Sequence, residues 1–255
     1  MPNITQLIAL KEKYGAKNNI NTRQLKTLNE NFSASAYQIK NSFASAGLDS
    51  GILSFFENQE SADIILLFID ITSFSTKCKN YTNNQLSIYL DNYYDLVIPL
   101  IYANGGEIEK IMGDGIIAIF GQPFLGDNET RLFERADTCA KDIIIKTKGT
   151  DKEVKIALHN GSVMYYKNKT IKYPEYTVIG KPLTELYRLE SVANNNAISF
   201  YYLNKYDNQI FSKDGAYCLS TRSPISCKYF TKSGLVSVSL PGVDSPYIKH
   251  LSCTS

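Results

Sequence analysis

The sequence has no tryptophan, only two histidines and no long hydrophobic segment. Its longest uninterrupted apolar run is the six residues from Ile64 to Ile69. A helix that spans a bilayer needs ~20 apolar residues, so no membrane segment is expected. The first twenty residues also lack the apolar core of a signal peptide. These absences predict a cytoplasmic protein that does not work at a membrane.

Cysteine is equally sparse and irregularly placed. The five cysteines are an odd number, and none of them forms a CxxC pair. With so few histidines there is no cluster with zinc-ligand spacing, so any bound metal should be a hard ion held by carboxylates. Reduced thiols in a cytosol are the expectation for Cys78, Cys139, Cys218, Cys227 and Cys253.

A strong excess of charge of one sign is missing too. Lys and Arg total 27 against 25 for Asp and Glu, which argues against a nucleic-acid partner. The GxxxxGK[ST] and GxSxG motifs are absent. Residues 113–118 match GxGxxA, but they lead into an apolar run typical of a strand, whereas a dinucleotide-binding fingerprint leads into a helix.

The chain that remains has a globular composition, with 44% hydrophobic and 20% charged residues. We expect a helical extension over residues 1–58, based on the spacing of Ile4–Ile8 and Tyr37–Phe43, and one domain over 59–255. Hydrophobic periodicity in the domain predicts an α+β fold, in which flanking helices pack on a mixed, largely antiparallel sheet. The elements expected are a strand over 63–71, a helix from 82 to 105, a hairpin of 107–112 with 116–120, a helix over 129–146, strands over 154–158, 163–166 and 176–179, a helix after Gly180, and edge strands near 228–230 and 235–238.

Two aspartates stand at positions suited to chemistry. Asp70 closes the most apolar strand, and Asp114 lies in the Gly113-Asp114-Gly115 turn between two short strands. Each has an ordinary structural explanation, as a cap or as a turn residue. If the hairpin pairs beside the first strand, both carboxylates reach one edge of the sheet and together could bind two divalent ions.

Four sequence blocks in order resemble the class III nucleotide cyclases. They are Phe68–Ser75, Glu109–Gly121, His159–Gly161 and Tyr176–Gly180, followed by Arg188. Each block is a weak signal alone, but four in register make a specific one. The resemblance implies a ferredoxin-like catalytic domain. His159 matches a position without a catalytic role in the family and is expected to be structural.

The resemblance also implies roles for individual residues. Asp70, Asp114 and the backbone carbonyl of Ile71 would bind two Mg²⁺ or Mn²⁺ ions. Backbone amides of the segment that follows would bind the triphosphate of the substrate. The residues of that segment are Thr72, Ser73 and Phe74.

The remaining roles concern the base, the ribose and the reacting phosphate. Lys110 and Thr177 match positions that face adenine in adenine-selective members, and Arg188 matches the arginine that stabilises charge on the α-phosphate. Thr184 stands where the family usually has a ribose-orienting asparagine. A late lysine that holds pyrophosphate could be either Lys228 or Lys232.

Family members form head-to-tail dimers in which each site takes residues from both protomers, and this chain carries both halves. The resemblance therefore implies a homodimer that converts a nucleoside triphosphate to a 3′,5′-cyclic nucleotide and pyrophosphate. The altered ribose position resembles that of the pyrimidine cyclases of Pycsar anti-phage systems, so uridylate cyclase is the leading expectation. Adenylate cyclase is the alternative, because of Lys110 and Thr177. A domain that binds nucleotide without turnover is the alternative of another class.

Overall fold

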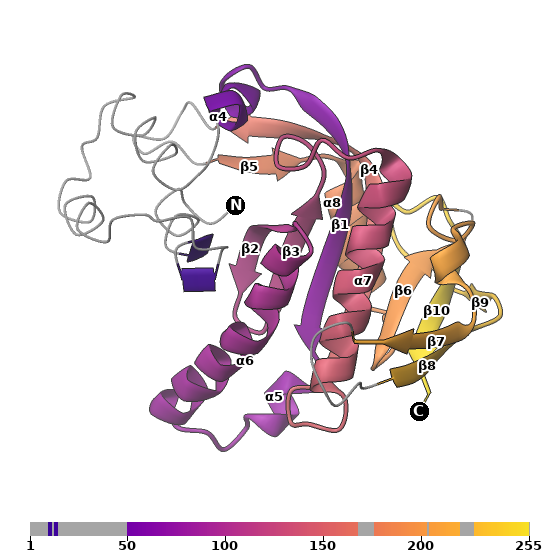
Figure 1. Ribbon diagram of the computed structural model, residues 1–255. Coiled ribbons are helices and arrows are strands. Elements are labelled where there is room, and N and C mark those ends of the chain that lie inside the picture. The colour runs from indigo at the N-terminus through magenta and orange to yellow at the C-terminus, as the bar shows by residue number, and fades with distance from the viewer. Residues whose placement is uncertain are drawn as a thin grey trace.

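The computed structural model describes residues 10–11, 13–14, 50–167, 176–202, 204–219 and 227–254. Within these ranges, ten strands form one sheet with flanking helices (Figure 1). The strand order is β2-β3-β1-β4-β6-β10-β8-β7, with β5 beside β4 and β9 beside β10. Only the pairing of β4 with β6 is parallel among the described strands. The predicted α+β fold with a largely antiparallel sheet is confirmed.

The strands are β1 (Ser61–Ile71), β2 (Glu107–Met112), β3 (Gly115–Phe120), β4 (Val154–Lys167), β5 (Tyr176–Ile179), β6 (Ala197–Tyr201), β7 (Gly215–Cys218), β8 (Cys227–Lys232), β9 (Val236–Ser237) and β10 (Tyr247–Cys253). The helices are α4 (Ser50–Glu57), α5 (Phe74–Lys77), α6 (Asn83–Ala103), α7 (Glu129–Thr147) and α8 (Lys181–Glu190), with a 3₁₀ turn, η1 (Ile210–Ser212). The helices predicted over Ile4–Ile8 and Tyr37–Phe43 lie outside the described residues, and the domain boundary at residue 58 stays a prediction.

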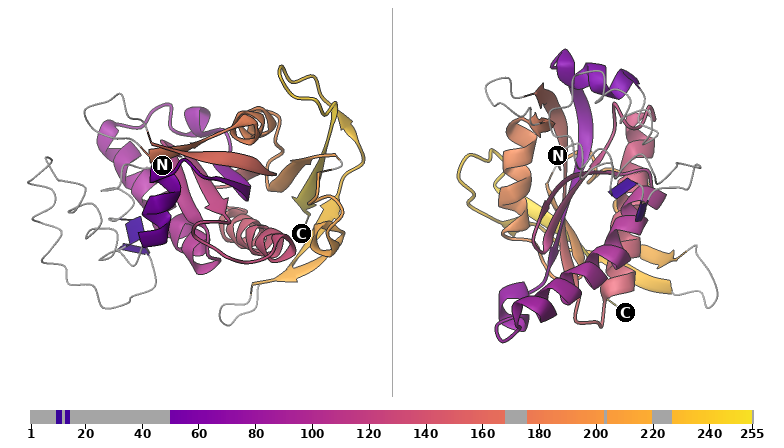
Figure 2. Two further views of the ribbon diagram at one scale, coloured as in Figure 1. Left: turned by 90° about the horizontal axis from the view of Figure 1, so that it is seen from above. Right: turned by 90° about the vertical axis from the view of Figure 1, so that its left-hand side faces the viewer.

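The centre of the sheet is buried on both faces, which explains the unbroken apolar run in β1. Ile65, Leu67 and Ile69 belong to the core under α6 and α7, whereas the alternate residues of β1 face the core under α4 and α8. Figure 2 shows α7 and α8 on opposite sides of the sheet. A strand covered on both faces has no need for alternating polarity.

The long helices begin where their caps require. Thr82 caps α6 in a capping box with Gln85, in which each residue accepts a hydrogen bond from the backbone N–H of the other. Asn128 caps α7 by accepting from the amide of Arg131. Each such cap contributes about 1 kcal/mol to helix stability. The predicted starts of both helices are confirmed.

The tail differs from the expected edge strands. β6 is buried throughout, and β10 lies between β6 and β8 inside the sheet. Of the predicted strand over 235–238, only Val236–Ser237 pairs with β10. The sequence of this region alternates irregularly and so does not indicate which of its strands lie inside the sheet.

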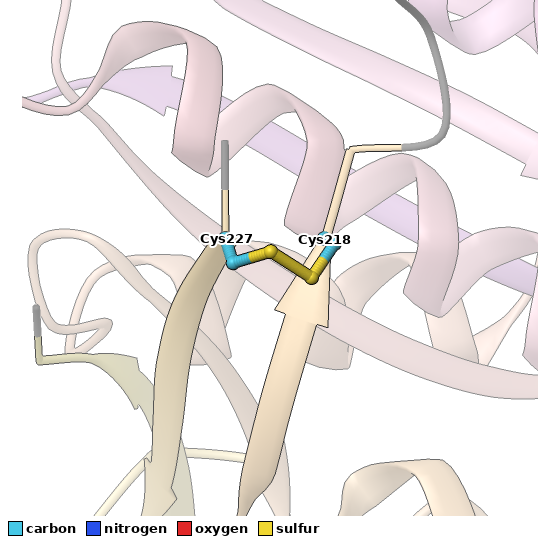
Figure 3. The surroundings of a disulfide bond; sticks show 2 residues. All are labelled: Cys218 and Cys227. Atoms are coloured by element: carbon cyan, nitrogen blue, oxygen red, sulfur yellow. A yellow bond between two sulfur atoms is a disulfide. The ribbon is translucent and has the colours of Figure 1, made fainter. Parts of the chain in front are cut away.

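The cysteines also differ from expectation. Cys218 and Cys227 form a disulfide (Figure 3). They are direct cross-strand partners of the β7–β8 hairpin, with Cα atoms 4.0 Å apart. The expectation of reduced thiols throughout is therefore wrong for these two, because hairpin register rather than sequence spacing brings them together. Cys78, Cys139 and Cys253 are free thiols.

A search of the described helices for an apolar stretch long enough to cross a membrane found none.

Candidate functional site

Asp70 and Asp114 meet at one end of the central strands. β1 pairs with β3, and the β2–β3 turn places Asp114 beside the last residues of β1. The two carboxyl groups interact electrostatically, and the negative charge of Asp114 disfavours ionisation of Asp70. Gly115 makes room for this approach, because a Cβ atom there would lie 2.8 Å from the ring of Phe68 and 3.6 Å from Oδ1 of Asp70. The structure thus brings together the two carboxylates singled out from the sequence.

The environment of the pair disfavours two negative charges. Burial, followed by the charges of Asp114 and Glu190, raises the pKa of Asp70 to about 7, although Lys155 opposes this shift. Burial also raises the pKa of Asp114. Carboxylates held this close are stabilised by a cation between them, and their oxygen atoms suit a hard divalent ion. In the described ranges, no group of three or more His, Cys, Asp or Glu side chains could hold a metal.

Lys155 is a member of this site that sequence reasoning missed. It lies on β4 directly opposite Asp70. Its Nζ is 3.5 Å from Oδ2 of Asp70 and 2.6 Å from Oε1 of Glu190, at the end of α8. The register of β1 against β4 brings Lys155 to Asp70, and no local sequence pattern around Lys155 predicts this contact. The ammonium group of Lys155 lies beside the carboxylates and could bind a phosphate group in addition to any metal ion there.

The segment predicted to bind the triphosphate follows β1 directly. The amide of Thr72 donates to the carbonyl of Glu153 at 2.8 Å, so it is already in use within the fold. Ser73 adopts the left-handed conformation, with φ at 56°, and precedes the short helix α5. The prediction of phosphate-binding amides therefore narrows to Ser73 and Phe74.

Thr177, which is predicted to face the base, contacts a buried carboxylate. Its hydroxyl donates to Oε1 of Glu109 at 2.9 Å, and Glu109 is 1% exposed. The pairing of β2 with β3 shifts register between Ile108 and Lys110, which leaves Glu109 in a bulge. Lys110 is exposed. No pattern in the sequence indicates the bulge, and so Glu109 was missed.

Thr184 and Arg188 lie one turn apart on α8, and both are exposed. Residues four apart share one face of a helix, so the two side chains can reach the same ligand. Within the described part of the chain, no hydrogen bond or ion pair connects Arg188 to Asp70 or Asp114.

The two candidate lysines of the tail differ in their surroundings. Nζ of Lys232 is 2.5 Å from Oδ1 of Asp207 and lies over the ring of Phe200. Lys228 pairs with Tyr217 in the β7–β8 ladder, and its side chain has no hydrogen bond or ion pair to any residue that the structure describes. Lys232, in contrast, is engaged within the fold.

His159 has a structural environment. It is 9% exposed on β4, and its Nε2 lies 3.0 Å from Oε2 of Glu185 on α8. Burial lowers the pKa of His159 despite this hydrogen bond, and burial also lowers the pKa of His250 on β10. Both histidines are therefore favoured in the neutral form by the folded protein.

This burial predicts loss of stability in acid. Below about pH 6.5, the unfolded chain binds protons at histidines that the folded chain keeps neutral. The contribution of these two histidines to the free energy of unfolding should therefore fall as the pH decreases from 7.5 to 5, whereas Asp70, whose pKa is raised to about 7, contributes in the opposite direction. Urea denaturation over this range measures the slope, and His159→Gln and His250→Gln should each reduce it. An unchanged slope in both variants would contradict the assignment.

Comparisons with known proteins point to one fold. No family model matches the chain, and no curated protein matches it in sequence. Solved structures do match. The guanylyl cyclase Cya2 has a TM-score of 0.59 at 20% sequence identity, and the aligned region covers 77% of this chain and 95% of the Cya2 chain. The guanylate cyclase domain of RhGC from Catenaria anguillulae, in complex with GTP, has a TM-score of 0.57 at 18% identity, with 77% and 100% covered. The adenylyl cyclase CyaB from P. aeruginosa has a TM-score of 0.53 at 17% identity, with 77% and 96% covered. The chain therefore has the fold of class III cyclase catalytic domains.

Proposed function

We propose that the protein is a nucleotide cyclase, which converts a nucleoside triphosphate to a 3′,5′-cyclic nucleotide and pyrophosphate. The observation that carries the proposal is the pair of apposed carboxylates, Asp70 and Asp114, in a chain with the fold of such enzymes. In the reaction, the ribose 3′-oxygen attacks the α-phosphorus, the bond to the bridging oxygen breaks, and pyrophosphate leaves. The 3′-hydroxyl proton must be lost, and negative charge develops around the α-phosphate.

Asp70, Asp114 and the carbonyl of Ile71 would hold two Mg²⁺ or Mn²⁺ ions, which would supply Lewis-acid activation of the hydroxyl and neutralise phosphate charge. Lys155 would leave its ion pairs with the carboxylates to contact the phosphate chain, and Ser73 and Phe74 would donate amides to it. Lys228 would bind the leaving pyrophosphate.

Arg188 would stabilise the charge that develops on the α-phosphate, because its planar group donates two parallel hydrogen bonds. Thr184, one turn away, would orient the ribose. The resemblance to cyclases that form head-to-tail dimers supports a composite site, in which Arg188 and Thr184 act on a nucleotide held by the carboxylates of a partner copy. We therefore propose a homodimer with two such sites.

For the base, we propose uracil. The pair of Glu109 and Thr177 combines a buried carboxylate acceptor with a hydroxyl that donates to it and that could turn to donate to a base. Uracil offers a ring N–H beside a carbonyl, and so fits this pair. Adenine and cytosine offer an acceptor nitrogen beside an amino group, which places a lone pair against the carboxylate. The adenylate alternative depended on Lys110, which is exposed and has no described contact with Thr177.

Guanine has the same ring N–H beside a carbonyl as uracil, so guanylate cyclase is the second candidate on the same observation. The choice of uracil between the two rests on the substitution of Thr184 for the usual asparagine and on the resemblance to pyrimidine cyclases. That resemblance also extends the proposal to cyclic UMP as a second messenger in anti-phage defence.

The test is to incubate the purified full chain with Mn²⁺ and each of UTP, GTP, CTP and ATP, and to identify the products by mass. We expect cyclic UMP and pyrophosphate in equal amounts. Cyclic GMP as the main product would select the second candidate, and cyclic AMP or cyclic CMP would contradict the role given to Glu109. Nucleotide binding without any product would instead indicate a non-catalytic binding domain.

A further inference from the structure

A lysine from the start of the chain neutralises a buried carboxylate in the sheet. Nζ of Lys11 lies 2.7 Å from Oε2 of Glu107, and Glu107 is 2% exposed. Burial raises the pKa of Glu107, and Lys11 opposes this shift. Glu107 is the first residue of β2, which is the edge strand of the sheet. A buried carboxylate without its cation is strongly destabilised, so the position of β2 depends on this distant segment.

Further contacts fix the described residues of this segment beside β2 and α6. Leu10 and Tyr14 pack against the core under α6 and α7. Nζ of Lys13 lies 2.7 Å from Oδ1 of Asp95 on α6, and the hydroxyl of Tyr14 donates to the same oxygen. Figure 1 shows these residues as short indigo pieces near β2. Lys11 is thus held in place from both sides along the chain.

Two routes lead from Lys11 to the Glu109–Thr177 pair. The first is β2 itself, because Glu107 and Glu109 lie two residues apart on either side of the register shift. A residue added in a bulge has few ladder hydrogen bonds to hold it, so its position follows that of its flanking residues.

The second route runs through aromatic rings. Lys11 lies over Phe124, 5.9 Å from the ring centre, and Phe124 packs edge-on against Tyr165 on β4. Tyr165 pairs with Val178, the residue after Thr177 on β5.

We propose that Lys11 and Glu107 are positioning residues for base recognition, which connect the described residues around Lys11 to the Glu109–Thr177 pair. This inference rests on the proposed function of the Glu109–Thr177 pair. Loss of the Lys11 charge lets β2 relax at its start, which moves Glu109 away from Thr177. Asp70 is held by β1 in the middle of the sheet and is not displaced. The effect therefore falls on KM and base selectivity more than on kcat.

The test uses the full chain with Lys11→Met, which keeps the length of the side chain and removes its charge. We expect KM for the preferred nucleotide to rise about tenfold, selectivity over ATP to fall by a similar factor, and kcat to change less than twofold. Lys11→Arg should restore both values. Lys13→Met is the matched control, because it removes an exposed ion pair of the same segment and leaves Glu107 untouched.

Unchanged KM and selectivity in a folded Lys11→Met protein would overturn the proposal, as would an equal effect of Lys13→Met. If Lys11→Met does not fold, Glu107→Gln replaces it, because a neutral side chain at that position needs no cation and should fold. It also lacks the ion pair that holds the start of β2, so KM and selectivity should change in the same direction. If the unmodified protein converts no nucleotide, the proposed catalytic function is wrong. The positioning role is then tested by measuring dissociation constants for Mn²⁺-UTP and Mn²⁺-ATP instead of KM. If Lys11→Met binds UTP over ATP with the same selectivity as the unmodified protein, the positioning role is overturned.

Discussion

Replacing Asp70 with asparagine is expected to lower kcat by roughly a thousandfold or more, because the electrostatic stabilisation assembled around the reacting phosphate is lost. The amide keeps the shape of the side chain but not the charge that holds a divalent ion. Asp63→Asn is the matched control, since Asp63 lies on the same strand and is exposed at its opposite end. That variant should retain full activity.

The same substitution should leave the fold intact. In the metal-free protein, burial and the neighbouring charges of Asp114 and Glu190 disfavour ionised Asp70, whose pKa lies at about 7. An unfolded aspartate ionises near pH 3.9, so the folded protein binds the extra proton and is destabilised as the pH rises through this window. Asp70→Asn removes this penalty, and its melting temperature at pH 8 should equal or exceed that of the unmodified protein.

Mn²⁺ separates this explanation from a purely structural role for Asp70. The ion should raise the melting temperature of the unmodified protein and of Asp63→Asn, but not that of Asp70→Asn. Retention of more than a tenth of the activity by Asp70→Asn in saturating Mn²⁺ would contradict a metal-binding role.

The sequence allowed prediction of Asp70 and Asp114 because their positions depend on local signals. A run of apolar residues that ends in a polar one defines the end of a strand, and Asp-Gly between two short apolar runs defines a hairpin. Pairing of that hairpin with the strand is then enough to bring the carboxylates together. The caps at Thr82 and Asn128 are local in the same sense.

Lys155, Glu109 and the Cys218–Cys227 bond were missed because each depends on strand register. Lys155 meets Asp70 only because β1 and β4 pair at that position, and Cys218 meets Cys227 only through the register of β7 with β8. Glu109 faces Thr177 because of one bulge. A shift of one residue turns a side chain to the other face of a sheet, and side-chain periodicity alone does not reveal where the shift occurs.

Replacing the residue in the bulge, Glu109, is expected to change which base the enzyme prefers. Glu109→Gln replaces a group that only accepts hydrogen bonds with an amide that donates and accepts. An amide complements the adjacent acceptor and donor of adenine and cytosine, whereas the carboxylate complements a ring N–H. We therefore expect kcat/KM for UTP to fall roughly 10- to 100-fold, and activity with ATP or CTP to rise relative to UTP.

Lys110→Gln is the control that decides between the two neighbouring residues. Lys110 is exposed on the strand next to the bulge, so the same replacement there should leave base preference unchanged. Competition assays with all four nucleotides at equal concentration, read by the mass of the products, measure both variants directly. A shift of preference in Lys110→Gln but not in Glu109→Gln would reverse the assignment and restore the adenine-facing role of the lysine. If Glu109→Gln alone shifts preference, one residue in a bulge determines which base the site accepts.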